Sequence, residues 1–162
     1  MSAIEDMPSA SAFEPEFIAR LRSIFEERIV FNRVLGLRIE TLAAEGVAAR
    51  IEMRPELIGH FTHQRLHGGV ISGTLDAIGG LAVLAAIGTR HLDEPIEARL
   101  QRFAKLGTID LRVDYLRPAT GPHFRATAQV LRLGSRVAST RMEFFDAEAR
   151  LLATGAAAYI VS

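Results

Sequence analysis

The sequence predicts an α+β domain in which one long apolar helix is wrapped by a curved antiparallel sheet. Residues 70–87 contain a single charged residue, Asp76, so a helix here is apolar on every side and has to be enclosed. Residues 108–161 hold four strand-like segments separated by short turns, which favours antiparallel neighbours. A curved sheet is the element available to cover such a helix.

The remaining segments fit around this pair. Residues 14–32 carry apolar residues at helical spacing and predict an amphipathic helix. A second amphipathic helix is expected over 93–106, with Gly107 as its C-cap, and an irregular loop over 54–66. Six strands are expected from composition and bounding turns, at 37–42, 47–53, 108–116, 124–133, 136–145 and 151–161. The two-residue segment Gly134-Ser135 suits a type II′ hairpin turn.

Length and composition narrow the class of protein. The 162 residues fit one domain at 13–162, preceded by a disordered leader at 1–12. Lys+Arg 19 against Asp+Glu 19 gives no net charge, which argues against a nucleic-acid partner. The absence of cysteine excludes a disulfide scaffold, a thiolate nucleophile and thiolate-bound zinc. The polar, acidic N-terminus lacks a signal-peptide pattern, so a cytoplasmic location is expected.

Asp76 needs an explanation, because it is a charged residue in an otherwise apolar helix. On insertion scales a central Asp costs about 2.5–3.5 kcal/mol in a membrane, so residues 70–87 are predicted as a core helix and no membrane partner is expected. In a protein core, a carboxylate is also costly unless it is paired, hydrogen-bonded or functional. Two interpretations stay open: a structural polar network or ion pair with an arginine, and a catalytic group.

Gly68 and Gly69 stand at the start of the same helix. Free N–H groups and the helix dipole at such a start favour negative charge, as an oxyanion hole requires, although a tight turn explains a lone Gly-Gly equally well. Asp76 follows Gly68 by eight residues, which is roughly 12 Å along a helix. One subunit therefore cannot easily supply both groups to one carbon atom. Two antiparallel helices in a symmetric homodimer could do so.

The run LHGGVISGTLDAIGG resembles the His-Gly-Gly…Asp motif of PaaI-type hotdog thioesterases, with the nine-residue step from His67 to Asp76. The segments 31–36, 107–119 and 153–161 are similar to the bacterial YigI group of that superfamily. The resemblance implies a hotdog fold and a cofactor-free acyl-CoA thioesterase of fatty acid metabolism. Its substrate would be medium- to long-chain or aromatic acyl-CoA, and its assembly a homodimer or a tetramer built from two dimers.

The resemblance also implies roles for single residues. Asp76 would act as nucleophile or as general base on water, and the Gly68 N–H would polarise the thioester carbonyl. His67 would shape the turn or contact the thioester. Thr108 matches a position where related enzymes use a hydroxyl to position water. Simple alternation places Thr108 on the strand face opposite Ile109, Leu111 and Val113, so its role depends on the geometry of the strand end.

The sequence departs from the family pattern in one place. Many PaaI-type enzymes have an Asn about six residues before the motif His, where this chain has Phe61, and His60, His63 or Gln64 could replace it. The substrate-binding candidates are Gly69, Phe61, His63, Gln64, Arg132 and Arg136. Arg132 and Arg136 flank the predicted turn, and their guanidinium groups could bind the phosphates of CoA. Arg99, Arg102 and Lys105 on the second helix are further candidates for phosphate binding.

Several alternatives remain at this stage. His60, His63 and His67 could bind zinc, but they lie in a loop without a supporting carboxylate, so no metal is expected. Phe61, Leu81, Leu84, Phe103 and Tyr115 could line an acyl tunnel or belong to the ordinary core. A non-catalytic acyl-CoA binding or sensing module, a hotdog dehydratase or hydratase and a purely structural protein are the competing functions.

Overall fold

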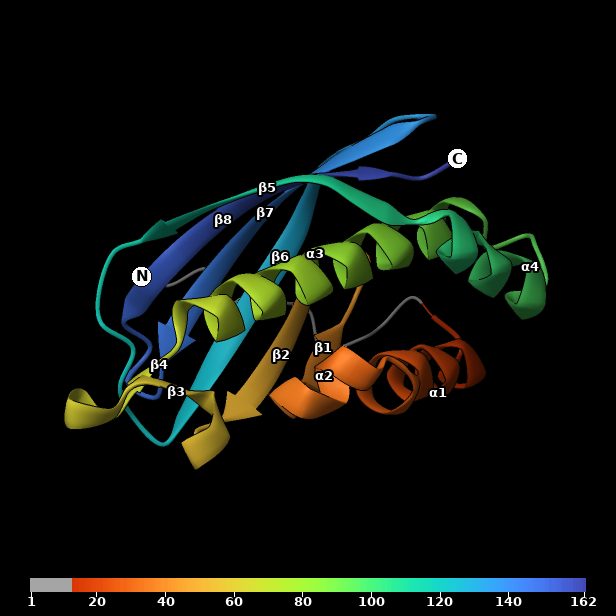
Figure 1. Ribbon diagram of the computed structural model, residues 1–162. Coiled ribbons are helices and arrows are strands. Elements are labelled where there is room, and N and C mark those ends of the chain that lie inside the picture. Colours follow the sequence, from red (N-terminus) through yellow and green to blue (C-terminus); the bar gives the residue numbers. More distant parts are fainter. Residues whose placement is uncertain (1–12) are drawn as a thin grey trace.

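The computed structural model describes residues 13–162, and the leader expected at 1–12 lies outside the described residues. One long helix, α3 (Gly68–Arg90), lies in the hollow of a six-stranded antiparallel sheet (Figure 1). The strands are β1 (Arg38–Leu42), β2 (Val47–Glu52), β5 (Gly107–Tyr115), β6 (His123–Leu133), β7 (Val137–Asp146) and β8 (Leu151–Ile160). Each lies within one residue of its predicted bounds, and the predicted fold class is confirmed.

The strand order across the sheet is β1-β2-β6-β7-β8-β5, so β1 and β5 form its two edges. Burial alternates along β7, where Ala138, Thr140, Met142 and Phe144 are buried and face the helix. This period of two is what a strand shows when one face of its sheet is covered and the other is exposed. The covered face lies against α3, and the fold's core sits between them.

Helix α3 is apolar because it is enclosed. Leu75, Ile78 and Leu81 are at most 1% exposed, and they lie among core residues from the sheet. The helix is long and apolar enough to cross a membrane, but 67% of its most apolar stretch is buried inside the protein's own fold. Burial of this kind is expected for a core helix wrapped by protein, as the sequence predicted.

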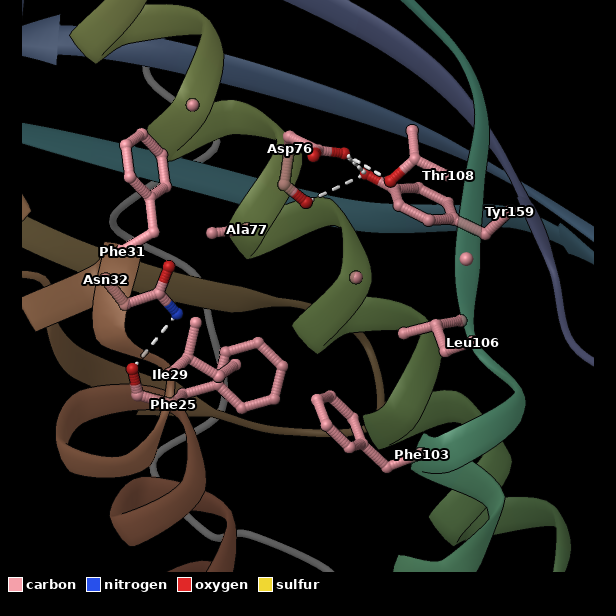
Figure 2. A pocket seen from close by; sticks show the side chains of 13 residues that line it. Phe25, Ile29, Phe31, Asn32, Asp76, Ala77, Phe103, Leu106, Thr108 and Tyr159 are labelled. Atoms are coloured by element: carbon pink, nitrogen blue, oxygen red, sulfur yellow. Dashed lines mark hydrogen bonds between the residues drawn. The ribbon is translucent and has the colours of Figure 1, made fainter.

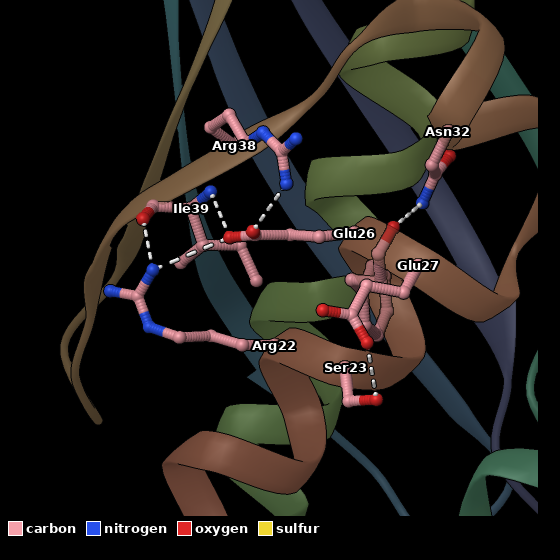
Figure 3. A network of polar contacts seen from close by, with 8 residues as sticks. Arg22, Ser23, Glu26, Glu27, Asn32, Arg38 and Ile39 are labelled. Carbon is pink, nitrogen blue, oxygen red and sulfur yellow. Dashed lines mark hydrogen bonds and ion pairs between the residues drawn. The ribbon is translucent and has the colours of Figure 1, made fainter.

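The N-terminal helix is less regular than predicted. Instead of one helix over 14–32, the chain forms α1 (Pro15–Arg22), a π-helical turn at Ser23–Arg28 and α2 (Val30–Leu35). The break falls at Ile29, whose ψ of 106° is extended. Wide π-turns leave a carbonyl without its usual partner. The buried Asn32 side chain donates its Nδ2 hydrogen to the Phe25 carbonyl at 3.0 Å, which satisfies such a group (Figure 3).

A carboxylate holds this segment against the sheet. The side chain of Glu26 accepts the Ile39 N–H at 2.8 Å and an Arg38 N–H at 3.1 Å, both from β1 (Figure 3). It also pairs with Arg22 at 3.3 Å, one helical turn away. The kinked helix is thereby fixed beside the first edge strand, with α2 ending at Gly36 in the left-handed conformation (φ 69°) that glycine adopts readily.

Two predictions for the connecting segments were wrong. The loop expected at 54–66 contains a small hairpin of β3 (Ile58–His60) and β4 (Arg65–Leu66), with 3-10 turns at Pro55–Leu57 and Phe61–His63. The β6–β7 hairpin is closed by the Gly134 N–H on the Val137 carbonyl, so Ser135 and Arg136 form its tip. Neither Gly134 nor Ser135 has the positive φ of a type II′ turn.

The second predicted helix forms as α4 (Ile96–Gln101) followed by a 3-10 turn at Arg102–Lys105. Gly107 is not its C-cap, because it already pairs with Ile160 as the first residue of β5. Arg99 was a candidate for binding a CoA phosphate but is 2% exposed, paired with Glu14 and stacked over the Phe17 ring. Its burial excludes it from contact with a CoA phosphate.

Candidate active site

A hollow of about 220 Å³ opens beside the middle of α3, and Asp76 lies in its wall (Figure 2). The other walls come from the kinked N-terminal helix, the 3-10 turn after α4 and the first residues of β5. Figure 2 shows the Asp76 side chain directed toward Thr108 and Tyr159, with Phe25, Ile29 and Phe103 gathered at the other end. The hollow is therefore polar at Asp76 and apolar away from it.

Only one oxygen of the Asp76 carboxylate is engaged within the described residues. Oδ1 accepts the Thr108 hydroxyl at 2.8 Å and the Tyr159 hydroxyl at 3.3 Å, whereas Oδ2 has no hydrogen-bond partner there. No Arg, Lys or His side chain among residues 13–162 pairs with it. The side chain is half-buried, so it is not the enclosed arginine ion pair that the sequence left open. Oδ2 can meet a water molecule or a ligand carbonyl.

A β-bulge explains how Thr108 reaches Asp76. Thr108 pairs with Tyr159 on β8 and Asp110 pairs with Ala158, so Ile109 is an extra residue in β5. The extra residue reverses the alternation, and Thr108 joins the helix-facing side while Ile109 is left 57% exposed. Alternation alone placed Thr108 on the opposite side from Leu111 and Val113.

Tyr159 is the second donor, and a glycine makes room for it. Its hydroxyl donates at 2.9 Å to the Asp76 backbone carbonyl as well as approaching the carboxylate. A Cβ atom on Gly79 would lie 2.2 Å from the Tyr159 hydroxyl oxygen, so only glycine fits there. Burial, followed by the nearby Asp76 carboxylate, raises the pKa of the Tyr159 phenol, which therefore stays protonated and donates.

The start of α3 presents a different arrangement. The His67 ring is the N-cap, and its Nδ1 accepts the Gly69 N–H at 2.8 Å, so that N–H is occupied. The Tyr115 hydroxyl donates to the Gly68 carbonyl at 2.9 Å and fixes this peptide. Among residues 13–162 the Gly68 N–H has no acceptor. Gly68 thus offers the free donor at the positive end of the helix dipole.

The predicted site residues fall into separate groups in the chain. Asp76 and Thr108 lie together at mid-helix, whereas His67, Gly68 and Gly69 form the helix start. Phe61, His63 and Gln64 lie in the exposed turn just before that start, with Phe61 83% exposed. No set of three metal-ligating side chains comes together in the described part of the chain, and the His67 ring is used as a cap.

Arg132 and Arg136 do come together, at a separate place. They line a hollow of about 350 Å³ at the β6–β7 turn with Val137 and Ser139, which belong to the outer face of the sheet. This hollow shares no lining residue with the one beside Asp76. Arg102 pairs with Glu94 at 2.6 Å. Arg132 and Arg136 therefore lie away from the Asp76 hollow within one chain, and Arg102 is engaged by Glu94.

The tunnel candidates also separate. Phe103 lines the Asp76 hollow, Leu81 and Leu84 are core residues, and Phe61 and Tyr115 are exposed. Asn32 and Tyr159, which line the hollow, were not identified from the sequence. Both lie in segments that the sequence did single out, 31–36 and 153–161. A buried polar residue in each segment is the signal that could have found them.

Comparison with known proteins agrees with the fold. Residues 63–153 match the protein family described as "Thioesterase superfamily". The chain is 38% identical over 138 residues to "Medium/long-chain acyl-CoA thioesterase YigI" of Escherichia coli K12, covering 85% of this chain and 89% of that protein.

Solved structures give the same result. A Shewanella oneidensis protein related to the thioesterase superfamily superimposes with a TM-score of 0.87 at 40% identity, covering 94% of this chain and 100% of the other. A thioesterase-like structure from Syntrophus aciditrophicus gives a TM-score of 0.80 at 34% identity, covering 91% and 97%. With its helix-wrapping sheet of the hotdog type, this chain belongs to the thioesterase superfamily and is a thioester hydrolase.

Proposed function

We propose that this protein hydrolyses medium- to long-chain acyl-CoA to free acid and CoA, with Asp76 as its catalytic carboxylate. The observation that carries the proposal is the state of that carboxylate: one oxygen is held by Thr108 and Tyr159, and the other is free beside an apolar hollow. The name of the Escherichia coli relative, a medium/long-chain acyl-CoA thioesterase, supports the same substrate class.

The free oxygen can act in two ways. As a general base, Asp76 Oδ2 takes a proton from water while the water oxygen bonds to the thioester carbonyl carbon. The tetrahedral intermediate then breaks its C–S bond, and CoA leaves as a thiolate that takes up the proton. As a nucleophile, Oδ2 bonds to the carbonyl carbon, and the C–S bond breaks so that CoA leaves as a thiolate. Water then hydrolyses the resulting anhydride, which restores the Asp76 carboxylate, releases the free acid and supplies the proton that the thiolate takes up. In both routes Thr108 and Tyr159 keep the carboxylate oriented, and no metal or cofactor is required.

The oxyanion donor in this proposal is the Gly68 N–H. It has no acceptor among the described residues, and its position at the helix start gives it a favourable dipole. The eight residues from Gly68 to Asp76 span roughly 12 Å of α3, whereas both groups must touch one carbonyl group. We therefore assign the donor to a second subunit, whose α3 runs antiparallel to the first.

The edge strand β5 is the surface that fits this dimer. It is hydrogen-bonded to β8 on one side only, and it carries Thr108 and the exposed Ile109 and Tyr115. Unpaired strand edges are ready to pair with another chain. Pairing of two β5 strands about a two-fold axis would continue the sheet and bring the two α3 helices side by side.

We assign the nucleotide part of CoA to the rim of this composite site. The protein is proposed to act in the cytoplasm. Exposed Arg132 and Arg136 are the candidates carried over from the sequence, and guanidinium groups suit phosphates. Phe61, His63, Gln64 and Gly69 lie next to Gly68, so they would face the substrate bound to the partner's Asp76. Arg136→Ala should weaken binding of acyl-CoA and leave turnover of a pantetheine-truncated thioester unchanged.

The first experiment is release of free thiol from acyl-CoAs of increasing chain length and from one aromatic acyl-CoA. Because the chain has no cysteine, a thiol reagent reports only the CoA released. We expect turnover of medium and long chains. Stoichiometric binding of acyl-CoA without any turnover would instead identify a binding or sensing module and reject the proposed hydrolysis.

The second experiment tests the shared site by mixing two inactive proteins. Asp76→Asn removes the carboxylate, and Gly68→Pro removes the N–H donor at the first helical position, where proline is tolerated. His67 before it already has the extended backbone (φ −67°, ψ 136°) that a following proline needs. Gly68→Ala is the matched control, because it adds a side chain but keeps the N–H.

After unfolding and refolding of an equal mixture, half of the dimers should be mixed, and each should contain one intact site out of two. About a quarter of the wild-type activity should therefore return. A mixture that stays inactive although mixed dimers have formed would mean that both groups act within one chain. That outcome rejects the shared site and leaves the role of Asp76 intact.

A further inference from the structure

A second hollow of about 630 Å³ lies next to the one beside Asp76. It runs between the kinked N-terminal helix and the segment formed by α4 and its 3-10 turn. Ile24, Leu100 and Ala104 contribute apolar wall, and Ile29 and Phe103 line both hollows. The two hollows therefore meet at the Ile29 and Phe103 side chains.

The size of the first hollow limits what it can hold. An apolar cavity of about 150 Å³ accepts benzene, with six carbon atoms. By that measure the hollow of about 220 Å³ beside Asp76 holds about nine non-hydrogen atoms, and the thioester group itself takes some of them. An acyl chain of more than about eight carbons must therefore leave this space, and its apolar end is formed by Phe25, Ile29 and Phe103.

From this continuity we propose that Ile29 and Phe103 form a gate and that the groove beyond them binds the distal half of a long, saturated acyl chain. This inference rests on the proposed acyl-CoA hydrolysis and adds the part of the molecule that selects chain length. Short chains use the first hollow alone. Medium and long chains gain affinity from the groove, by at most about fourfold for each methylene that it buries fully.

The gate residues are held in place by their own surroundings. The Phe103 ring packs edge-on against Phe25, with ring centroids 5.8 Å apart. Ile29 stands at the break between the π-turn and α2, and the Asn32 amide hydrogen-bonds to the Phe25 carbonyl across that break. The kink, which the sequence did not predict, thus places Ile29 in the wall that the two hollows share with Phe103.

The far part of the groove is polar at its rim. Arg20 on α1 donates to Glu97 on α4 at 2.7 Å, so this ion pair joins the two walls. Between the gate and the ion pair the apolar wall is formed by Ile24, Leu100 and Ala104, and Ser23, Arg28 and Gln101 also line the groove. An aliphatic chain fits the apolar part of this wall, since it needs apolar surface and makes no hydrogen bonds.

The test fills the groove without altering the first hollow. Ala104 is exposed and lines only the groove, so Ala104→Phe should reduce the volume available to a long chain. Ala19→Phe, at an exposed position of α1 that lines neither hollow, is the matched control. The readout is the ratio of kcat/KM for palmitoyl-CoA to that for hexanoyl-CoA.

We expect Ala104→Phe to lower this ratio at least tenfold and Ala19→Phe to leave it within twofold of wild type. Ile29→Ala, which widens the gate, should change the ratio in the opposite direction. A wild-type ratio in folded Ala104→Phe protein would overturn the inference, and so would an equal loss for both substrates.

A binding measurement separates this inference from the proposed function. If no acyl-CoA is hydrolysed, palmitoyl-CoA and hexanoyl-CoA are titrated calorimetrically into wild type and Ala104→Phe. A loss of affinity limited to palmitoyl-CoA would keep the groove and reject the hydrolysis. Equal affinities in both proteins would reject the groove, whatever the outcome for activity.

Discussion

Two aspartates among residues 13–162 are withdrawn from solvent by the fold, and their carboxylates are bonded in opposite ways. Asp146, at the end of β7, is 4% exposed, and both its oxygens are occupied. It accepts the Glu148 and Arg150 N–H groups at 3.0 and 2.9 Å and the Arg150 Nε at 2.7 Å. Asp76 is half-buried, accepts two hydroxyl donors on one oxygen and leaves the other free.

This difference separates a structural carboxylate from a reactive one. Burial acts to raise the pKa of Asp146, but the hydrogen bonds and charge supplied by Arg150, with the Glu148 N–H, outweigh it and hold that pKa below its usual value. Its lone pairs are used in closing the β7–β8 turn. Asp76 has neutral donors and an unused oxygen beside a hollow, which is the arrangement that a base or nucleophile requires.

The largest expected effect comes from exchanging each aspartate for asparagine. Asp76→Asn should lower kcat at least about a thousandfold, because the amide can neither accept a proton nor attack a carbonyl. Asp146→Asn should leave kcat within about threefold of wild type when measured on folded protein. Thiol release from one acyl-CoA measures both. Similar activities in the two variants would remove the distinction between them.

The Thr108 hydroxyl should have the next largest effect. Thr108→Val keeps the shape of the side chain but removes the donor to Asp76, and a hydrogen bond to a charged group contributes about 1.5–3 kcal/mol. We expect kcat to fall about thirtyfold. Thr108→Ser keeps a hydroxyl and should recover most of the activity. If serine and valine were equally impaired, the methyl group rather than the hydroxyl would be responsible.

Asp146→Asn should lower the stability of the protein rather than its activity. Loss of the charge that receives three donors should lower the free energy of unfolding by about 2 kcal/mol. Urea unfolding at pH 7 measures it. Glu148→Gln is the control in the same turn, because Glu148 is exposed and its ion pair with Arg150 contributes little. Asp76→Asn should be close to wild type in this experiment.

Gly79 gives a smaller and more local test of the Asp76 site. Gly79→Ala brings a Cβ to 2.2 Å from the Tyr159 hydroxyl, so the ring must move away from Asp76. We expect kcat to fall about tenfold, the cost of about one hydrogen bond. Tyr159→Phe should cost a similar factor, and the double variant should cost no more than either. Fully multiplying effects would show that Gly79 acts independently of Tyr159.

The sequence was sufficient to predict a helix or strand wherever a hydrophobic pattern repeats within that element. The apolar run around Asp76 and the alternation in the strands predicted α3 and all six strands of the sheet. It was insufficient where contacts between distant segments decide the structure. The bulge at Ile109 and the room that Gly79 makes for Tyr159 depend on partners far along the chain. The kink held by Asn32 depends on a side chain that bonds the Phe25 carbonyl seven residues earlier, which no helical periodicity reveals.

The smallest expected effect is the loss at acid pH of the stabilisation that the Asp146 carboxylate provides. The lowered pKa of Asp146 means that its stabilisation is fully present above the unfolded pKa, about 3.9, and is lost as the pH falls through the folded value. The difference in unfolding free energy between wild type and Asp146→Asn should therefore be constant from pH 7 to 5 and decrease below about pH 4. Urea midpoints at closely spaced pH values measure it, with Glu148→Gln expected to stay flat. A difference that persists unchanged at pH 2.5 would mean that folding does not lower the pKa of Asp146.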